Sequence, residues 1–296
     1  KTPSPPPIPS PTAIPSPSPT ASSSPSPAIP TPTPSPSPGL LPTPVYLVLA
    51  SGDYDGDGTS DVALFHSGSG LWAVRDITRT HFGTNGDWPV SGDYDGDGTT
   101  DIGVFRRDSG LWAVQDISRA YFGSSLDRPV PADYDGDRMC DAGVFRDNSG
   151  MWAIREITRI CFGTQWDLPA PGDFNGDGTG DIAVVRGDYR PGFWAIRGIS
   201  RFSFWQGGYG YIPQPGDYDG DGSDEAAVYG QIEGLWMIRD ITYSFWGRCC
   251  DSSPSGADYN GDGLRDIGIF NEAGRWAVSG ITRCWFGSTG DIPVTR

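Results

Sequence analysis

Acidic residues recur at short, regular spacing in residues 93–101, which read Asp-Tyr-Asp-Gly-Asp-Gly-Thr-Thr-Asp. Carboxylates stand at positions 1, 3, 5 and 9 of this nonapeptide, and glycine stands at position 6. Alternate carboxylates on a tightly turning loop converge on one point, and glycine relieves the backbone where the turn is sharpest. Ca²⁺ accepts about six to eight such hard oxygen ligands in flexible geometry. The nonapeptide therefore predicts a calcium-binding loop.

The same nonapeptide occurs six times, at intervals of 40, 40, 40, 44 and 41 residues. The predicted metal ligands, loop by loop, are Asp53, Asp55, Asp57 and Asp61; Asp93, Asp95, Asp97 and Asp101; Asp133, Asp135, Asp137 and Asp141; Asp173, Asn175, Asp177 and Asp181; Asp217, Asp219, Asp221 and Glu225; Asp258, Asn260, Asp262 and Asp266. Up to six Ca²⁺ are expected. The alternative is that these are solvated acidic turns without metal, which six copies in register disfavour.

The six loops differ at a few positions. Asparagine replaces the acid at position 3 of the fourth and sixth loops and still offers a carbonyl oxygen. The fifth loop ends in Glu225, which is long enough for bidentate binding, after an extra Asp224. The third loop is the weakest candidate, because Arg138 stands where glycine is expected. In the second loop the Thr99 carbonyl is the expected fifth ligand.

The acidic balance of the chain has a local source. The formal net charge of the 296 residues is −16, and the six nonapeptides hold 23 of the 37 acids. Bound Ca²⁺ would add about +12 and leave the domain near neutral. The negative charge argues against nucleic acid and anionic membrane surfaces as partners. The chain has no run of about 20 apolar residues, so no membrane span is expected.

A short apolar strand is predicted directly after each loop, as in Ile102-Gly103-Val104-Phe105. A glycine turn follows, and then a strand that carries one tryptophan per repeat, at Trp72, Trp112, Trp152, Trp194, Trp236 and Trp276. A last strand ends near Phe-Gly or Trp-Gly, before a run such as residues 86–90 (Gly-Asp-Trp-Pro-Val) starts the next unit. Four short strands in about 40 residues are typical of propeller blades. The sequence predicts an all-β fold, a six-bladed β-propeller of four-stranded blades over residues 45–296.

Asp-x-Asp-x-Asp-Gly-x-x-Asp followed by an apolar strand resembles the FG-GAP/VCBS repeat, the calcium-loop blade of integrin α-subunit propellers and of many bacterial surface proteins. The resemblance covers residues 46–296. It implies a propeller with Ca²⁺ held in hairpin loops and a role in adhesion or assembly. The chain differs from the integrin pattern in having six predicted blades, where that family has seven.

Residues 1–44 form a separate segment rich in proline, serine and threonine, with 18 prolines. Such a segment favours extended polyproline II over helix or sheet. It is interpreted either as a linker or as a stalk that carries O-linked sugars. The candidate glycosylation sites are Ser4, Ser10, Thr12, Ser16, Ser18, Thr20, Ser26, Thr31, Thr33, Ser35 and Ser37. Because the first residue is Lys1, we expect a processed chain with an extracellular or cell-surface location.

The strand predicted at residues 45–50 competes with a second run for the same place in the ring. Residues 290–294 repeat the sequence that introduces each blade, so the C-terminus can reach the first blade. One of these strands would then be available to pair with a neighbouring subunit by strand addition. We therefore expect residues 1–50 to link subunits of a fibre or surface array, with a flexible spacer as the alternative.

The five cysteines show no spacing typical of a zinc site. Cys140 with Cys161, and Cys249 or Cys250 with Cys284, are the disulfide pairs that an exported protein would allow, and buried or idle thiols are the alternative.

The expected function is a non-enzymatic structural or adhesive propeller, with self-association or other surface proteins as partners. The alternative is a carbohydrate-binding, lectin-like propeller on a flexible stalk. The tryptophan repeated in each blade is interpreted as core, and Trp88, Trp166 and Trp205, which lie outside that position, are the better candidates for a contact surface. An enzyme is disfavoured because neither His66 nor His81 lies near a nucleophile motif. The glutamates outside the loops are Glu156, Glu233 and Glu272.

Overall fold

The computed structural model describes residues 52–186, 192–206, 210–247, 252–271, 274–287 and 291–294. The predicted extended segment at residues 1–44 and the predicted strand at residues 45–50 lie outside the described residues. In the described part no helix is long and apolar enough to cross a membrane.

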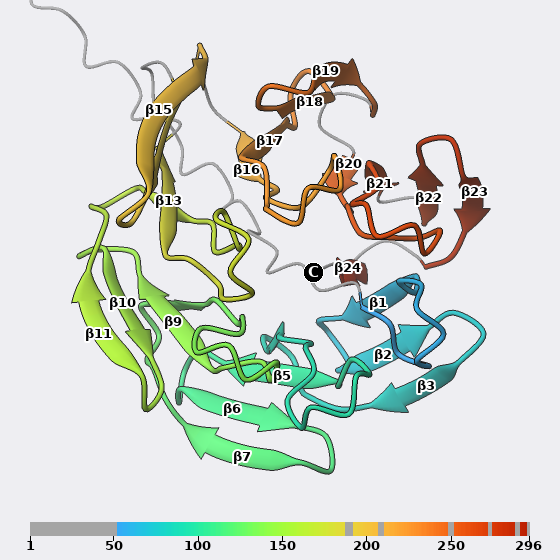
Figure 1. Cartoon of the computed structure of the whole chain (residues 1–296). Helices are drawn as coiled ribbons and strands as arrows, with labels where there is room; N and C mark the ends of the chain where they lie inside the picture. Colours follow the sequence, from blue (N-terminus) through green and yellow to red (C-terminus); the bar gives the residue numbers. More distant parts are fainter. Residues whose placement is uncertain are drawn as a thin grey trace, which may run out of the picture. The chain divides into compact units, whose positions relative to one another are not determined.

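The described residues form six four-stranded antiparallel sheets. The strands are β1 (Ala63–His66), β2 (Leu71–Val74), β3 (Thr78–His81), β4 (Trp88–Pro89), β5 (Gly103–Arg106), β6 (Leu111–Val114), β7 (Ser118–Tyr121), β8 (Asp127–Pro129), β9 (Gly143–Arg146), β10 (Met151–Ile154), β11 (Thr158–Cys161), β12 (Leu168–Pro169), β13 (Ala183–Arg186), β14 (Gly192–Ile196), β15 (Ser200–Trp205), β16 (Tyr211–Pro213), β17 (Ala227–Gly230), β18 (Leu235–Ile238), β19 (Thr242–Phe245), β20 (Ser252–Pro254), β21 (Gly268–Asn271), β22 (Arg275–Val278), β23 (Thr282–Trp285) and β24 (Asp291–Val294). The sheets stand around a common centre as blades (Figure 1). The predicted six-bladed β-propeller is confirmed.

The last strand of the chain completes the first blade. Five sheets consist of four consecutive strands, whereas the first has the order β24-β1-β2-β3. β24 pairs with β1 in antiparallel register, with Ala63 opposite Val294 and His66 opposite Asp291. The prediction that the C-terminal run reaches the first blade is confirmed, and this pairing joins the two ends of the ring.

The hydrophobic core lies between neighbouring blades and is built from the repeated aromatic residues. Phe65 and Trp72 face each other on paired strands, with ring centroids 5.1 Å apart. Both are fully buried and pack with Val104 and Ala113 of the next blade. The Trp72 indole N–H also donates to the Phe82 carbonyl oxygen at 3.0 Å, so the buried polar atom is paired. The repeated tryptophan is therefore core, as predicted.

An ion pair joins the inner strand to its neighbour in the second, third and fourth blades. Asp127 at the start of β8 is fully buried and accepts hydrogen bonds from the Arg146 guanidinium on β9, at 2.7 Å and 3.0 Å. Asp87 with Arg106 makes the same contact in the second blade, and the fourth blade repeats it. A buried carboxylate needs such a partner, which explains the recurring Asp in the run that introduces these blades.

Candidate metal centres

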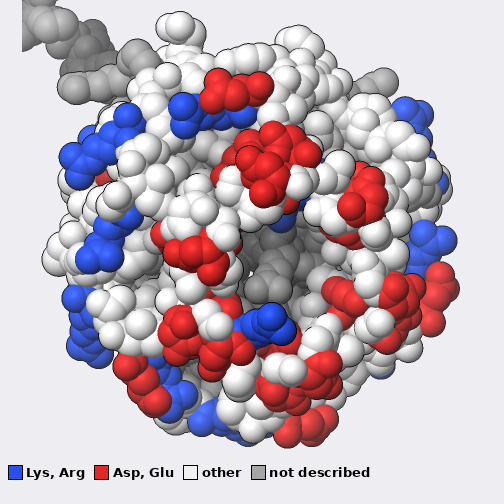
Figure 2. Space-filling model, in the orientation of Figure 1, with Lys and Arg blue, Asp and Glu red and all other residues white. Residues whose placement is uncertain are grey.

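In the second to sixth blades the acidic nonapeptide connects the innermost strand to the second strand, and in the first blade it directly precedes β1. In the second blade, residues 93–101 separate β4 from β5. The loop is closed at its base by Gly92 and Asp101, whose backbones pair as an isolated β-bridge. The acidic side chains gather around the centre of one face of the ring (Figure 2). The repeat thus presents six acidic loops around one axis.

The first aspartate of each loop organises the backbone around itself. Asp93 accepts hydrogen bonds from the N–H groups of Gly96 at 2.6 Å and Gly98 at 2.9 Å, one on each carboxylate oxygen. Both glycines have positive φ, 78° and 88°, a region that L side chains disfavour. This geometry explains the glycines at positions 4 and 6 and turns the loop tightly enough for its carboxylates to meet.

The ninth residue brings a carboxylate back to the start of the loop. Asp101 Oδ2 accepts the Tyr94 N–H at 2.8 Å, and the contact is repeated in all six loops, by Glu225 in the fifth. As a result, ligand atoms of Asp93, Asp95 and Asp101 lie within 4.8 Å of one another. Position 9 is therefore folded onto positions 1 and 3 by a backbone hydrogen bond.

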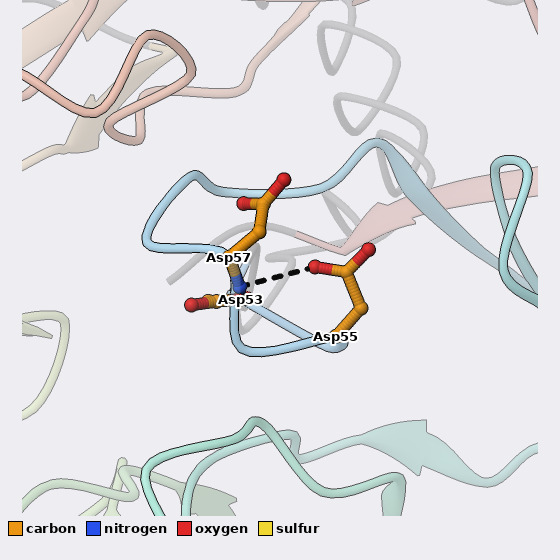
Figure 3. A group of neighbouring side chains, drawn as sticks. All are labelled: Asp53, Asp55 and Asp57. Atoms are coloured by element: carbon orange, nitrogen blue, oxygen red, sulfur yellow. Dashed lines mark hydrogen bonds between the residues drawn. The ribbon is translucent and has the colours of Figure 1, made fainter.

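Four of the six loops bring three carboxylates together, at positions 1, 3 and 9 in the second, third and fifth loops and at positions 1, 3 and 5 in the first. The groups are Asp53, Asp55 and Asp57; Asp93, Asp95 and Asp101; Asp133, Asp135 and Asp141; Asp217, Asp219 and Glu225. Figure 3 shows the first, in which Asp53, Asp55 and Asp57 project from one tight turn and the Asp57 N–H donates to Asp55 Oδ1 at 3.2 Å. A set of carboxylate oxygens fits a hard cation, and Ca²⁺ in particular because its geometry is flexible.

The fourth and sixth loops have asparagine at position 3. In the fourth loop the Asn175 Nδ2 donates to Asp181 at 3.2 Å and 3.3 Å, and Asn260 makes a similar contact with Asp266 at 3.4 Å. A cation between these groups would be bound by the amide oxygen, which requires the opposite orientation of the amide. The loops otherwise keep the hydrogen bonds of the other four.

The third loop, the weakest candidate by sequence, has the same shape as the others. Arg138 adopts φ of 71° and its N–H donates to Asp133 Oδ2 at 2.8 Å, as glycine does elsewhere. Accordingly, Asp133, Asp135 and Asp141 of this loop form one of the four groups of three carboxylates. Arg138 thus strains the backbone at position 6, but the conformation of the loop is unchanged.

The carboxyl at position 9 is electrostatically strained without a cation. Partial burial raises the pKa of Asp61, Asp101 and Asp141 to about 6, and the other acids of each loop add to the rise. The same causes raise the pKa of Glu225 to about 7. By contrast, the pKa of Asp97 is lowered, because the Thr99 hydroxyl donates to it. A divalent cation would favour the ionised form of every group.

A ring of backbone hydrogen bonds connects the six loops. The N–H at position 8 donates to the carbonyl oxygen at position 1 of the preceding loop: Ser60 to Asp258, Thr100 to Asp53, Cys140 to Asp93, Gly180 to Asp133, Asp224 to Asp173 and Arg265 to Asp217, at 2.5–2.6 Å. The variable residue at position 8 gives no sign of this contact in the sequence, because the backbone makes it. The side chain at position 8 packs on the preceding blade, as Cys140 does on Gly92.

A cavity of about 650 Å³ opens at the centre of the ring, between the inner strands and the loops. Its wall includes Gln214, which is 1% exposed, and Asp224 and Arg265 at position 8 of the fifth and sixth loops. Burial raises the pKa of Asp224 to about 6, while Arg265 counteracts the rise. The wall of this cavity includes residues of the same loops that form the candidate metal centres.

The predicted contact tryptophans differ in their exposure. Trp166 is 78% exposed, Trp88 is half-buried beneath the Arg107 guanidinium at 4.7 Å, and Trp205 is buried at 5%. Trp205 is therefore not a contact residue, because its ring packs into the core between the fourth and fifth blades. Four exposed aromatic residues were not predicted as contact residues: Tyr121 at the end of β7, Tyr243 and Phe245 on β19, and Trp285 at the end of β23.

None of the three cysteines that the structure describes is part of a disulfide. Cys140, at position 8 of the third loop, is buried, whereas Cys161, at the outer end of β11, is exposed. The predicted Cys140–Cys161 disulfide is wrong, because the two residues lie on the inner and outer parts of a blade. Cys284 is half-buried, and its predicted partners, Cys249 and Cys250, lie outside the described residues.

Comparisons with known proteins identify the fold and no family. No family model matches the chain, and no curated protein is significantly similar to it in sequence. Among solved structures, BBS1N in complex with ARL6DN is 10% identical with a TM-score of 0.50, and the match covers 81% of this chain and 83% of that chain. An Agrocybe aegerita lectin, described as recognising non-reducing terminal N-acetylglucosamine, is 16% identical with a TM-score of 0.50, covering 84% and 80%. The chain is thus a six-bladed β-propeller with repeated acidic clusters.

Proposed function

We propose that this chain is a calcium-stabilised, non-enzymatic propeller of the FG-GAP/VCBS kind that acts in adhesion or surface structure outside the cell. The observation that carries the proposal is the ring of six acidic loops, each joined to the next by a backbone hydrogen bond, in which four loops bring three carboxylates within 4.8 Å of one another. Ca²⁺ would supply positive charge and a fixed coordination geometry to each loop.

In the second loop Asp93, Asp95 and Asp101 would hold the ion, and the equivalent residues would do so elsewhere. Asp93 also accepts the Cys140 N–H of the third loop on its carbonyl oxygen, while the Thr100 N–H of the second loop donates to the Asp53 carbonyl oxygen of the first. An ion that fixes Asp93 therefore also fixes the contact with the neighbouring loop. Calcium binding would stiffen one whole face of the propeller, which suits a domain that bears load.

Chelation tests this proposal. Removal of metal should lower the melting temperature of the full chain markedly, because the loops then carry uncompensated negative charge. Added Ca²⁺ should restore the melting temperature, and Mg²⁺ should do so poorly, because it demands near-ideal octahedral geometry. A melting curve that excess chelator leaves unchanged, with no metal found by elemental analysis, would contradict the proposal.

We assign to residues 1–50 the role of joining one subunit to the next, supported by the sequence alone. About 44 residues of polyproline II reach roughly 130 Å, and β24 already completes the first blade, so the strand predicted at residues 45–50 is available elsewhere. O-linked sugars on the serines and threonines would keep the segment extended. Deletion of residues 1–50 should abolish polymers seen by electron microscopy; if the truncated protein still polymerises, the segment is a spacer.

Carbohydrate binding is the second candidate function. It is supported by aromatic side chains on the outer surface, among them Trp166 and Trp285, which are 78% and 71% exposed. Aromatic rings of this kind offer a large apolar contact and are enriched at binding surfaces. The lectin neighbour adds that the same fold serves glycan recognition in another protein. Saturable binding on a glycan array, lost on replacing these tryptophans, would support this function over a purely structural one.

A further inference from the structure

A cavity of about 430 Å³ lies between the fifth and sixth blades, away from the acidic loops. Its wall is formed by Trp246, which follows β19 of the fifth blade, and by residues of β21, β22 and β23 of the sixth. These include the side chains of Arg275, Arg283 and Trp285. The cavity therefore combines aromatic and cationic groups in a chain whose net charge is −16.

The cavity exists because one residue breaks the pattern of the other blades. The residue before the repeated tryptophan is apolar in the first five blades, as Leu71, Leu111, Met151, Phe193 and Leu235. In three of these blades it shares a core cluster with the aromatic residue that ends the preceding blade: Leu111 with Phe82, Met151 with Phe122 and Phe193 with Phe162. At the equivalent position the sixth blade has Arg275, which is exposed. The space that leucine or phenylalanine fills elsewhere is left open beside Trp246.

The two arginines of the cavity lie over two of its tryptophans. The Arg275 guanidinium is 5.4 Å from the centroid of the Trp285 ring, and that of Arg283 is 5.6 Å from Trp246. Trp285 is 71% exposed, so its ring is accessible from solvent. Each tryptophan thus has a cation at one face, an arrangement that keeps the guanidinium in place at the mouth of the cavity.

A third tryptophan at the cavity has an unused hydrogen-bond donor. Trp276 is 1% exposed, and its indole N–H finds no acceptor among the described residues. In the first three blades the equivalent indole donates to a backbone carbonyl, as Trp112 does to Phe122 at 3.0 Å, whereas the indoles of Trp194 and Trp236 in the fourth and fifth blades also find no acceptor among the described residues. A buried donor without a partner is costly, and a bound ligand with acceptor oxygens would relieve that cost.

The charge of the cavity indicates an acidic ligand. Exposed arginines at the hairpins have carboxylate neighbours, such as Arg155 with Glu156 and Arg239 with Asp240. Arg275 and Arg283 form no ion pair with any carboxylate of the described residues. Guanidinium groups bind planar carboxylates in bidentate geometry. The cavity thus offers two guanidinium groups to a carboxylate of a ligand. It also offers two tryptophan rings against which an apolar face of the ligand can pack.

We infer that this cavity binds a carboxylate-bearing sugar, such as a uronic acid residue of a glycan. The pyranose C–H face would lie against Trp285 or Trp246, the carboxylate would pair with Arg275 and Arg283, and ring hydroxyls would accept the free indole N–H. A polyproline II segment also docks on aromatic grooves. Residues 1–44, however, contain no aspartate or glutamate, and so provide no partner for the arginines. The assignment rests on the second candidate function and gives it a site and a ligand class.

Calorimetric titration of the full chain, saturated with Ca²⁺, tests the assignment with two sugars that differ only at C6. Methyl glucuronide carries the carboxylate and methyl glucoside carries a hydroxymethyl group. We expect the glucuronide to bind at least about 10-fold more tightly than the glucoside, the range typical of a charge-assisted contact. Arg275→Leu, which restores the residue type of the first, second and fifth blades, should weaken glucuronide binding at least about 10-fold while leaving the fold intact.

Matched variants complete the experiment. Arg119→Leu, the counterpart of Arg283 in the second blade, should leave binding unchanged, whereas Trp285→Ala should weaken both sugars. Equal binding of the two sugars, binding that survives Arg275→Leu, or a peptide of residues 1–38 that binds in place of the glucuronide would each overturn the assignment. Glycan binding that Arg275→Leu leaves unchanged would take place at another site. It would support the second candidate function and contradict only the assignment of this cavity. If the chain bound no glycan, both the second candidate function and the site in this cavity would be contradicted. Neither outcome bears on the calcium proposal, which chelation tests separately.

Discussion

At the scale of a residue, Arg138 shows that backbone hydrogen bonds determine the conformation of an acidic loop. Its N–H donates to Asp133 from a left-handed conformation, where the other five loops have glycine. Such a conformation costs roughly 1–2 kcal/mol for a residue with a side chain. The loop keeps its shape because the hydrogen bonds to Asp133 and to the neighbouring loops hold it.

Arg138→Gly should therefore stabilise the protein by about 1 kcal/mol, since it removes backbone strain at a position that needs φ > 0. It should also increase the calcium affinity of the third loop by removing a positive charge beside the site. The matched variant Gly98→Arg transfers the strain to the second loop and should destabilise by a similar amount. Urea unfolding measures both changes, and a destabilising Arg138→Gly would contradict this reading of the loop.

The carboxyls at position 9 predict an unusual pH dependence for the metal-free protein. Their pKa values are about 6 for Asp61, Asp101 and Asp141 and about 7 for Glu225, above the ordinary values of 3.8 and 4.5. Between about pH 4 and pH 7 the folded state then binds more protons than the unfolded state, so stability is lost as pH rises. With Ca²⁺ bound the dependence should reverse, because protons compete with the metal.

Melting temperatures in chelator and in Ca²⁺, measured from pH 4 to pH 7.5, check this expectation. Asp101→Asn removes one titrating group and should reduce the slope in chelator. A metal-free melting temperature that rises steadily across this range would show that the carboxyls are not strained in the way described.

At the scale of elements, the link between the two inner strands of a blade depends on a buried ion pair. Asp127 is fully buried, and its carboxylate is held by Arg146 at 2.7 Å and 3.0 Å. Arg146→Leu leaves this carboxylate without its cation, and breaking such a pair costs about 3–5 kcal/mol when burial is complete. Because Arg146 itself is partly exposed, we expect about 2–3 kcal/mol, measured by chemical denaturation. Arg159→Leu on exposed β11 is the control, and an equal loss in both variants would contradict the role of the pair.

The strands and the order of elements could be predicted from the sequence, because the pattern of loop, apolar strand and tryptophan strand repeats six times. The converging carboxylates followed from the spacing of Asp93, Asp95 and Asp101. The cavity beside Arg275 was not predicted, although aligning the repeats shows an arginine where leucine is usual. Contacts made by backbone atoms, such as the hydrogen bond from the Cys140 N–H to Asp93, could not be predicted because they do not depend on residue type. The predicted Cys140–Cys161 disulfide was wrong because spacing along the chain says little about distance across a blade.

At the scale of the whole molecule, two devices close the ring of blades. β24 completes the first sheet through its pairing with β1, and the Ser60 N–H donates to the Asp258 carbonyl oxygen to join the last loop to the first. The first device is sheet hydrogen bonding, and the second joins residues of two candidate metal centres. The proposed calcium ions would therefore strengthen the closure of the propeller as well as each separate loop.

The number of calcium ions held by the folded chain tests this account most directly. Native mass spectrometry of the full chain in Ca²⁺ should show six bound ions, and a variant with Asp93→Ala and Asp101→Ala in the second loop should show five and a lower melting temperature. A chain that binds no calcium, or a count that the variant leaves unchanged, would contradict the claim that the six acidic loops are metal centres.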